Sequence, residues 1–500
     1  MSNDVIEPRP ADSGDVVPSV SDLVDVNVIE LRLPCRSFRI RYKVAEPGEF
    51  SMTTEFLLRL LRLVNALPET TIGEFFGFTN DETRFIVDHV ENQGYVRRSK
   101  GRVHLTDAGH GLFSESEEPA LFEVSNKEER FDFDLISLAP SDQFRIFDDF
   151  EYRLPELSIE PMETGEQASA VVMRAFKRFF QEFRLKRGGT RLEKQSLYTV
   201  DFVNAEQRFS TLVPVTVSVR KDDPEFPEAS VLEWRSGTEL DDRSGIVQKC
   251  AEFVRSIQWR ADQFAPSAIS TCTRIAPSQL AGMVKDNHLN AEAFFKATLR
   301  QAGELRVDRQ TVRVVGQLWT DPNRARFASA LKYAIARSSS RPKMQFWLKP
   351  SIPHWGATRR VAGILGAVEK QLAETPDGAI RSILAGEGRV SRFKTRFNGI
   401  LTFPNSSLPS GLEIFLVPSH VVYVAVHSPL KHAEGYPVPI GIISFDSEVL
   451  SRAQAALFDI LRVPGVSAHH CDWNAADMVV EAQAVLAPVV ADTSEENTVE

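Results

Sequence analysis

The chain has 500 residues, a mass of 56.0 kDa and a formal net charge of -10, from 58 Lys and Arg against 68 Asp and Glu. Hydrophobic residues at 43% and charged residues at 25% are ordinary values, which exclude a collagen, a coiled coil and a wholly disordered chain. The length predicts about two to four domains. We expect a cytoplasmic protein without a membrane segment, because no apolar run approaches the ~20 residues that cross a bilayer and the start of the chain is acidic and Pro-rich. Four dispersed cysteines fit a reducing compartment.

The first ordered region begins with a strand and continues with helices. Alternation within residues 27–44 predicts a half-buried strand, and residues 53–67 carry apolar side chains on one helical face until Pro68 ends the helix. A short second helix follows. Thr79 and Glu82 have the spacing of a capping box, which predicts a third helix running to Gln93.

A basic hairpin follows these helices. Residues 95–105 read as two short strands around the turn 97–102, and the Leu-Thr-x-x-Gly sequence at 105–109 predicts another helix. This order resembles a winged helix-turn-helix domain, and the run GYVRRSKGRVHLTDAGHGLF at 94–113 is the part most similar to that family. The resemblance covers residues 53–115. It implies a domain that binds DNA or, equally, one that connects proteins.

The rest of the chain predicts two further domains between polar ends. A Phe- and Arg-rich helix at 168–186, strands at 197–220 and 229–235 and a helix at 244–262 predict an α+β middle domain. After residue 290 helical and strand patterns alternate, which predicts a layered α/β domain. Its expected helices are 291–302, 323–337, 358–373 and 447–461, and its expected strands are 311–318, 343–348, 398–403, 412–427 and 438–444.

The predicted fold class is therefore α+β and α/β multi-domain, with an N-terminal winged helix, an α+β middle domain and a C-terminal layered α/β domain. The predicted segments are a disordered tail (1–24), a strand plus winged helix domain (25–115), an acidic connector (116–166), the middle domain (167–290), the basic α/β domain (291–485) and an acidic tail (486–500).

Charge is distributed unevenly along the chain. Residues 111–170 carry 4 basic and 16 acidic side chains, whereas residues 291–400 carry 20 basic and 8 acidic ones. A basic block of this size attracts polyanions, of which nucleic acid is the commonest in a cytoplasm. The alternative is that the acidic block folds against the basic one, or that both are solvated faces.

Two sets of residues are the predicted nucleic-acid contacts. The first lies in the winged helix, where cations of the hairpin reach phosphates and the start of the third helix reads bases: Asn80, Arg84, Arg97, Arg98, Lys100 and Arg102. The third helix also carries acids, which a duplex backbone would repel, and the alternative is a dimerisation or docking module. The second set lies in the basic block: Arg341, Lys343, Trp347, Lys349, Trp355, Arg359, Arg360, Arg389, Arg392, Lys394 and Arg396. Its alternative is that both Trp are buried and the cations merely solvated.

A third group of cations, between Arg174 and Lys194, is interleaved with Phe176, Phe179, Phe180 and Phe183. Aromatic rings among cations can stack on the bases of single strands. The spacing of three and four residues favours the other interpretation, in which these rings form the buried side of an amphipathic helix.

No catalytic motif emerges. The P-loop, the dinucleotide fingerprint, the nucleophile elbow and the His-Glu-x-x-His helix are all missing. The end of the chain faintly resembles half of a phospholipase D-like domain, but His420, His427, Lys431 and His432 have the wrong spacing for its motif. That resemblance, without its catalytic residues, implies a binding scaffold.

Two groups of residues weakly resemble metal-binding sites. Asp222 and Asp223 followed by Glu233-Trp234-Arg235 approach the acidic motif of a Mg²⁺-dependent nuclease, with Arg in place of the usual Lys. His469, His470, Cys471 and Asp472 are possible ligands, but adjacent residues seldom converge on one ion. For the nuclease pattern, a surface turn followed by an ordinary strand explains the same residues.

The sequence thus predicts a nucleic-acid-binding, non-catalytic component of a larger cytoplasmic assembly, with DNA as the expected partner and with no metal or cofactor. It would hold phosphates through the hairpin and the basic surface. The alternatives are a Mg²⁺-dependent nuclease or phosphodiesterase, and a protein-protein adaptor that docks through the winged helix.

Overall fold

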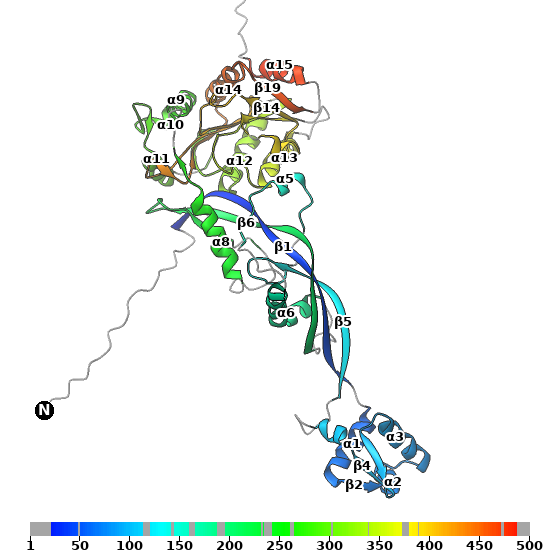
Figure 1. Cartoon of the computed structure of the whole chain (residues 1–500). Coiled ribbons are helices and arrows are strands. Elements are labelled where there is room, and N and C mark those ends of the chain that lie inside the picture. The colour runs from blue at the N-terminus through cyan, green and yellow to red at the C-terminus, as the bar shows by residue number, and fades with distance from the viewer. Residues whose placement is uncertain are drawn as a thin grey trace, which may run out of the picture. The chain divides into compact units, whose positions relative to one another are not determined.

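The computed structural model places the chain in two compact units, each built from separate stretches of sequence (Figure 1). Unit 1 consists of Met1–Pro34, Asp142–Glu160 and Phe209–Glu500, and unit 2 of Cys35–Ser141 and Pro161–Arg208. Helices and several sheets occur together, so the prediction of a mixed α+β multi-domain protein is confirmed at that level. The structure describes residues 22–48, 51–113, 121–141, 145–159, 166–187, 196–231, 234, 243–260, 265–301, 304–338, 340–372, 380–388, 390–471 and 475–487. Most of both predicted tails lies outside these residues.

Unit 2 contains a long antiparallel ribbon covered by a helix. Strands β1 (Leu23–Gly48) and β5 (Leu121–Asp134) pair from Cys35 opposite Asp134 to Gly48 opposite Leu121. Helix α6 (Glu166–Arg187) and the start of β6 (Ser196–Arg220) complete this part, and β1 and β6 contribute residues to both units. Alternate β1 residues pack into one apolar cluster with the rings of α6: Phe38, Ile40, Tyr42, Val44, Phe176, Phe179, Phe180 and Phe183. The prediction that these α6 rings are buried is confirmed.

The remainder of unit 2 is a small helical module with its own apolar core. Its elements are α1 (Met52–Val64), β2 (Ala66–Pro68), α2 (Glu69–Phe76), α3 (Asn80–Asn92), β3 (Val96–Ser99), β4 (Arg102–Leu105) and α4 (Asp107–Gly111). The three strands form one sheet in the order β2-β4-β3. The capping box predicted at Thr79 and Glu82 is confirmed at the start of α3. The first helix ends three residues before its predicted end, because Asn65 adopts a φ of 62° that turns the chain into β2.

The hairpin between β3 and β4 has a defined turn. Ser99 lies opposite Arg102, and the two residues between them, Lys100 and Gly101, have φ values of 52° and 72°. Positive φ at both central positions is the signature of the type I′ turn, whose twist matches that of the paired strands. The turn therefore holds the basic residues of the hairpin at a fixed tip.

Unit 1 is organised around an eight-stranded mixed sheet in the order β11-β18-β16-β15-β12-β13-β14-β19. The bounds of these strands are β11 (Thr311–Val315), β12 (Met344–Leu348), β13 (Arg381–Glu387), β14 (Gly399–Phe403), β15 (Leu412–Val417), β16 (Val421–Ser428), β18 (Val438–Ser444) and β19 (Ser467–Cys471). Strands β12, β13 and β14 run parallel, and the other neighbours are antiparallel. The predicted single strand at 412–427 is wrong: a turn with Ser419 at φ 62° splits it into β15 and β16. Strand β13 was not predicted.

Unit 1 also contains helices and short strands outside this sheet, among them β7 (Glu228–Ser230), which pairs with β6. The helices are α5 (Asp149–Tyr152), α8 (Ser244–Ser256), α9 (Ala265–Ile275), α10 (Pro277–Leu280), α11 (Ala291–Arg300), α12 (Asp321–Arg337), α13 (Arg360–Leu372), η3 (Ser391–Phe393), α14 (Ser447–Leu461) and α15 (Ala475–Leu486). The short strands are β7 (Glu228–Ser230), β8 (Trp259–Arg260), β9 (Val284–Lys285), β10 (His288–Leu289) and β17 (Glu434–Gly435). Helices α12 and α13 pack together, and α14 packs against α9 and α15. Among the described helices none has the length and apolar character that spanning a bilayer requires.

Candidate nucleic-acid interface

Three cations of the hairpin in unit 2 are available for a ligand. Arg97, Lys100 and Arg102 are exposed, and within the described residues none of them forms an ion pair. They lie within six positions on a turn of fixed geometry. Long flexible cations that lack a protein partner are the side chains that hold the phosphates of a nucleic acid.

Arg98, the fourth cation of the hairpin, has a different role. Its guanidinium pairs with the carboxylates of Glu69 and Asp88, each at 2.5 Å, and of Glu91, whose other oxygen accepts the backbone N–H of Arg98 at 2.8 Å. Partial burial disfavours the charge of Arg98, but the three carboxylates outweigh burial and raise its pKa. Arg98 therefore links the hairpin to α2 and α3. The prediction that Arg98 contacts phosphates is corrected.

The exposed side of α3 is mixed in character. Asn80 and Arg84 are exposed as predicted, with the Arg84 guanidinium 3.9 Å from the Asp81 carboxylate. Phe85 is also 74% exposed, and Phe75 on α2 is 66% exposed. We did not predict these two rings as surface residues. A helical projection of α3 reveals Phe85, because it falls outside the buried row Thr83, Val87 and Val90.

The two tryptophans of the predicted second surface are buried. Trp347 and Trp355 are both 0% exposed, and their rings pack against each other with centroids 5.6 Å apart. Neither ring offers a face to a ligand at the surface, so the prediction that they contact nucleic acid is corrected. Both belong to the apolar core of unit 1, in accordance with the alternative interpretation.

Of the nine cations predicted as contacts in the basic block, four are paired with carboxylates of unit 1 among the described residues. Arg359 pairs with Glu30 at 2.8 Å and Glu151 at 3.8 Å, Arg360 with Asp321 at 3.4 Å, Lys394 with Asp149 at 3.5 Å and Arg396 with Asp148 at 2.9 Å. Three of the carboxylates, on residues 148, 149 and 151, come from the predicted acidic connector. The expectation of a continuous basic surface is thus corrected, and the alternative in which the acidic block pairs with the basic one holds at these positions.

The other predicted residues of the block are scattered. Arg341 and Lys343 are exposed before β12, and no ion pair is recorded for either among the described residues. Arg389 lies outside the described residues. Lys349 and Arg392 are half-buried near the carboxyl ends of β12 and β13.

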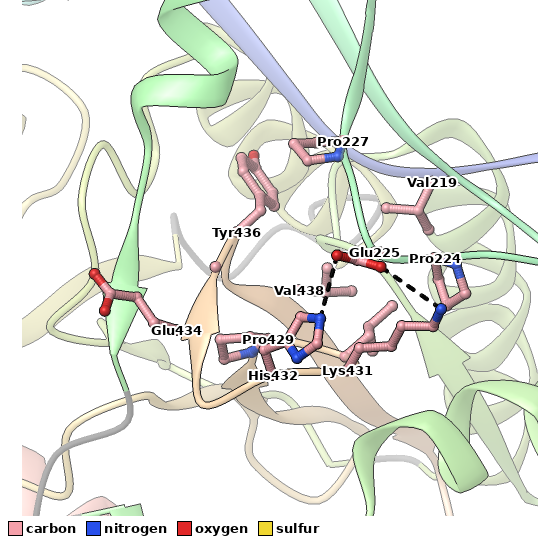
Figure 2. Close-up of a pocket in the computed structure, with 12 residues that line it drawn as sticks. Val219, Pro224, Glu225, Pro227, Pro429, Lys431, His432, Glu434, Tyr436 and Val438 are labelled. Carbon is pink, nitrogen blue, oxygen red and sulfur yellow. Dashed lines mark ion pairs between the residues drawn. The ribbon is translucent and has the colours of Figure 1, made fainter.

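Two of the acidic residues considered for a nuclease site form ion pairs with basic side chains. Asp222 pairs with Arg220 at 3.1 Å, and Asp223 pairs with Lys431 at 2.5 Å. Figure 2 shows Lys431 and His432 both directed at Glu225, at 3.8 and 3.2 Å. The cavity that they line has a volume of about 10 Å³, room for one water molecule. Glu233 and Arg235 lie outside the described residues.

The remaining histidines do not form a common site. His427 Nε2 lies 2.7 Å from one carboxyl oxygen of Glu413, and the other oxygen of Glu413 accepts the Trp347 indole N–H at 2.9 Å. His420 is buried elsewhere, with Nδ1 2.9 Å from the carbonyl oxygen of Pro418. Within the described part of the chain no group of three His, Cys, Asp or Glu side chains is placed to hold a metal ion. The side chains of His470, Cys471 and Asp472 lie outside that part.

The chain was compared with protein-family models, curated proteins and solved structures, and no match was found in any of the three.

Proposed function

We propose that the chain is a non-catalytic nucleic-acid-binding protein that contacts the phosphate backbone, of DNA in the first place, through the hairpin of unit 2. In this proposal the module formed by α1 to α4 and β2 to β4 is a winged helix domain, accompanied by an α+β middle domain and a C-terminal layered α/β domain. The protein is a component of a larger cytoplasmic assembly.

The observation that carries the proposal is the contrast between cations that have partners and cations that do not. In unit 1, Arg359, Lys394 and Arg396 are paired with carboxylates. On the hairpin, Arg97, Lys100 and Arg102 are exposed and unpaired among the described residues, while Arg98 alone bears the structural ion pairs. A paired cation gains little from a phosphate, whereas an unpaired one releases counterions when it binds. Exposed cations without an ion pair also occur in unit 1, at Arg341 and Lys343, but the hairpin places three of them within six positions and is therefore the favoured phosphate contact.

Removing the three charges is expected to abolish most of the affinity. Replacing Arg97, Lys100 and Arg102 by Gln in the full chain should weaken binding of a 30-base-pair duplex on the order of 1,000-fold at 0.1 M salt, since each of the three lost phosphate contacts forfeits roughly tenfold there. Fluorescence anisotropy with a labelled duplex measures this. The matched control replaces Arg300, Lys332 and Lys370, exposed cations of unit 1, by Gln. Equal affinity of both triple variants would contradict the proposal.

A second candidate function is supported by the rings on α2 and α3. Phe75 and Phe85 are exposed apolar side chains beside the acidic residues Asp81 and Glu74. Such a face suits a protein partner better than a phosphate backbone. If the module is an adaptor, Phe85→Ser abolishes capture of that partner, while the triple hairpin variant leaves it unchanged and duplex binding by the natural chain stays at background.

A further inference from the structure

Two cations of unit 1 lie together at the carboxyl ends of the parallel strands. Lys349 follows β12, and its backbone N–H donates to the carbonyl oxygen of Ala385 in β13 at 2.8 Å. A Cβ placed on Gly386 would lie 3.2 Å from the Cβ of Lys349, so the lysine stem runs close over β13. Arg392 belongs to η3, which follows β13, and its Nη2 donates to the carbonyl oxygen of Trp355 at 2.5 Å. Both cations are held by backbone contacts.

Neither cation forms an ion pair with a carboxylate among the described residues. The guanidinium of Arg392 lies over the Phe393 ring, 4.7 Å from its centroid, and its Nε is buried without an acceptor. Within the part of the chain that the structure describes, the ammonium of Lys349 donates to the carbonyl oxygen of Pro350, at 3.1 Å. Half-buried charges are normally paired, because leaving water costs free energy.

The nearby carboxylates are already committed to other groups. Glu387 accepts the backbone N–H groups of Ser407 and Leu408, each at 2.7 Å. Glu413 accepts from Trp347 and lies against His427. Both act on Lys349 at a distance, but neither is close enough to pair with it.

The pKa shifts of Lys349 and His354 are those expected for groups that lie near an unpaired positive charge. Burial, together with the charge of Arg392, lowers the pKa of Lys349 to about 8. The same two causes lower the pKa of His354. His354 also has a φ of 53°, a strained value for a residue other than glycine, and its ring lies 5.0 Å from that of Phe253. Strain and perturbed titration together are typical of binding sites.

We propose that Lys349 and Arg392 form a binding site for a phosphate group, with His354 at its edge. A phosphate dianion neutralises both cations and offers an acceptor to the buried Nε of Arg392. Phosphate oxygens also accept hydrogen bonds both from the planar guanidinium of an arginine and from the ammonium of a lysine. Loops that follow the carboxyl ends of parallel strands are the usual location of such sites in α/β sheets. The site belongs to unit 1 and does not depend on the hairpin function.

Titration calorimetry of the full chain with inorganic phosphate at pH 7 tests the site. We expect saturable binding in the millimolar range or tighter, weakened tenfold or more by Lys349→Met and restored by Lys349→Arg, which keeps the charge. Lys332→Met removes an exposed cation of α12 and should change nothing. A thermal melt of each variant establishes that it folds. Absence of saturable binding to the natural chain, or equal binding by folded Lys349→Met, overturns the proposal.

The pH dependence gives a second readout, with sulfate as the probe because its charge is constant between pH 7 and 9. The groups that face Lys349 are Arg392, Glu387 and Glu413, with His354 beside Arg392. A bound anion favours the protonated lysine, so affinity is full below pH 8 and falls above it, by up to about tenfold from pH 7 to 9. Affinity independent of pH over this range contradicts the role of Lys349.

The source of the phosphate group is distinguished by two short oligonucleotides that differ only in a 5′-phosphate or a 5′-hydroxyl. If the ligand is a strand end, the phosphorylated oligonucleotide binds more tightly, and Lys349→Met removes the difference. If the ligand is free phosphate or a small phosphate ester, inorganic phosphate binds and the two oligonucleotides bind equally. Because the triple hairpin variant leaves the calorimetric signal intact, failure of this site and failure of the hairpin proposal are separable.

Discussion

Replacing Glu413 by Ala is expected to lower the free energy of unfolding of unit 1 by about 3–5 kcal/mol, the cost of removing a fully buried side chain and leaving its two hydrogen-bond partners unsatisfied. Glu413 is 0% exposed, and its carboxylate holds the Trp347 indole N–H at 2.9 Å and His427 Nε2 at 2.7 Å. Alanine leaves both partners without their hydrogen bonds in the centre of the eight-stranded sheet. It also leaves a cavity that the neighbouring strands cannot fill.

Urea unfolding followed by tryptophan fluorescence measures this loss, because all six tryptophans lie in the sequence segments of unit 1. Glu413→Gln keeps an acceptor in place and should cost clearly less than alanine. The control is Glu448→Ala on α14, which removes an exposed carboxylate paired with Arg452 and should cost about 0–0.5 kcal/mol. If Glu413→Ala unfolds at the same urea concentration as Glu448→Ala, the buried pair does not stabilise the sheet.

The second large effect is expected in unit 2, where Gly109→Ala should unfold the helical module selectively. A Cβ on Gly109 would lie 2.1 Å from the carbonyl oxygen of Tyr95, a backbone atom that cannot move without displacing β3. Thr106 fixes the same junction, since its Oγ1 donates to the carbonyl oxygen of Gly94 at 2.6 Å and accepts the N–H of Gly109 at 3.0 Å. Overpacking of this kind costs about 1–3 kcal/mol or more.

Amide hydrogen exchange followed by mass spectrometry separates the two units. Exchange within residues 52–113 should accelerate about 5- to 100-fold, while the core strands of unit 1 keep their protection. Gly111→Ala, in the same helix, is the matched control, because nothing lies within 4 Å of a Cβ at that position. Equal exchange in the two variants would show that the approach to Tyr95 is not a constraint.

Local signals predicted the helical module well. The Thr79 capping box, the apolar period of α1 and the basic turn are each encoded within a few residues, and each corresponds to an observed element. The Leu-Thr-x-x-Gly sequence has a physical reason, which is the close approach of α4 to the start of β3 at Gly109. Strand β2 was missed because its three residues pair only through contacts with β4.

Which cations of the basic block form ion pairs was not predictable from local sequence. Ion pairs such as Arg359 with Glu30 join residues more than 300 positions apart, so a count of charges along the chain does not reveal them. Likewise, Lys349 and Glu413 come close only because β12 and β15 are neighbours in the sheet. The burial of Trp347 and Trp355 follows from the same tertiary packing. A sequence pattern of cations and aromatic residues in a loop does not distinguish buried rings from exposed ones.

The salt dependence of duplex binding tests the central claim most directly. A protein that holds the phosphate backbone loses affinity linearly in a plot of log K against log salt concentration, with a slope near -0.9 for each phosphate contact. The natural chain should show a slope of about -3 or steeper, and replacing Arg97, Lys100 and Arg102 by Gln should bring the slope toward zero by roughly 2 to 3. Absent binding, or a slope that is the same in the natural chain and the triple variant, would contradict phosphate recognition by the hairpin.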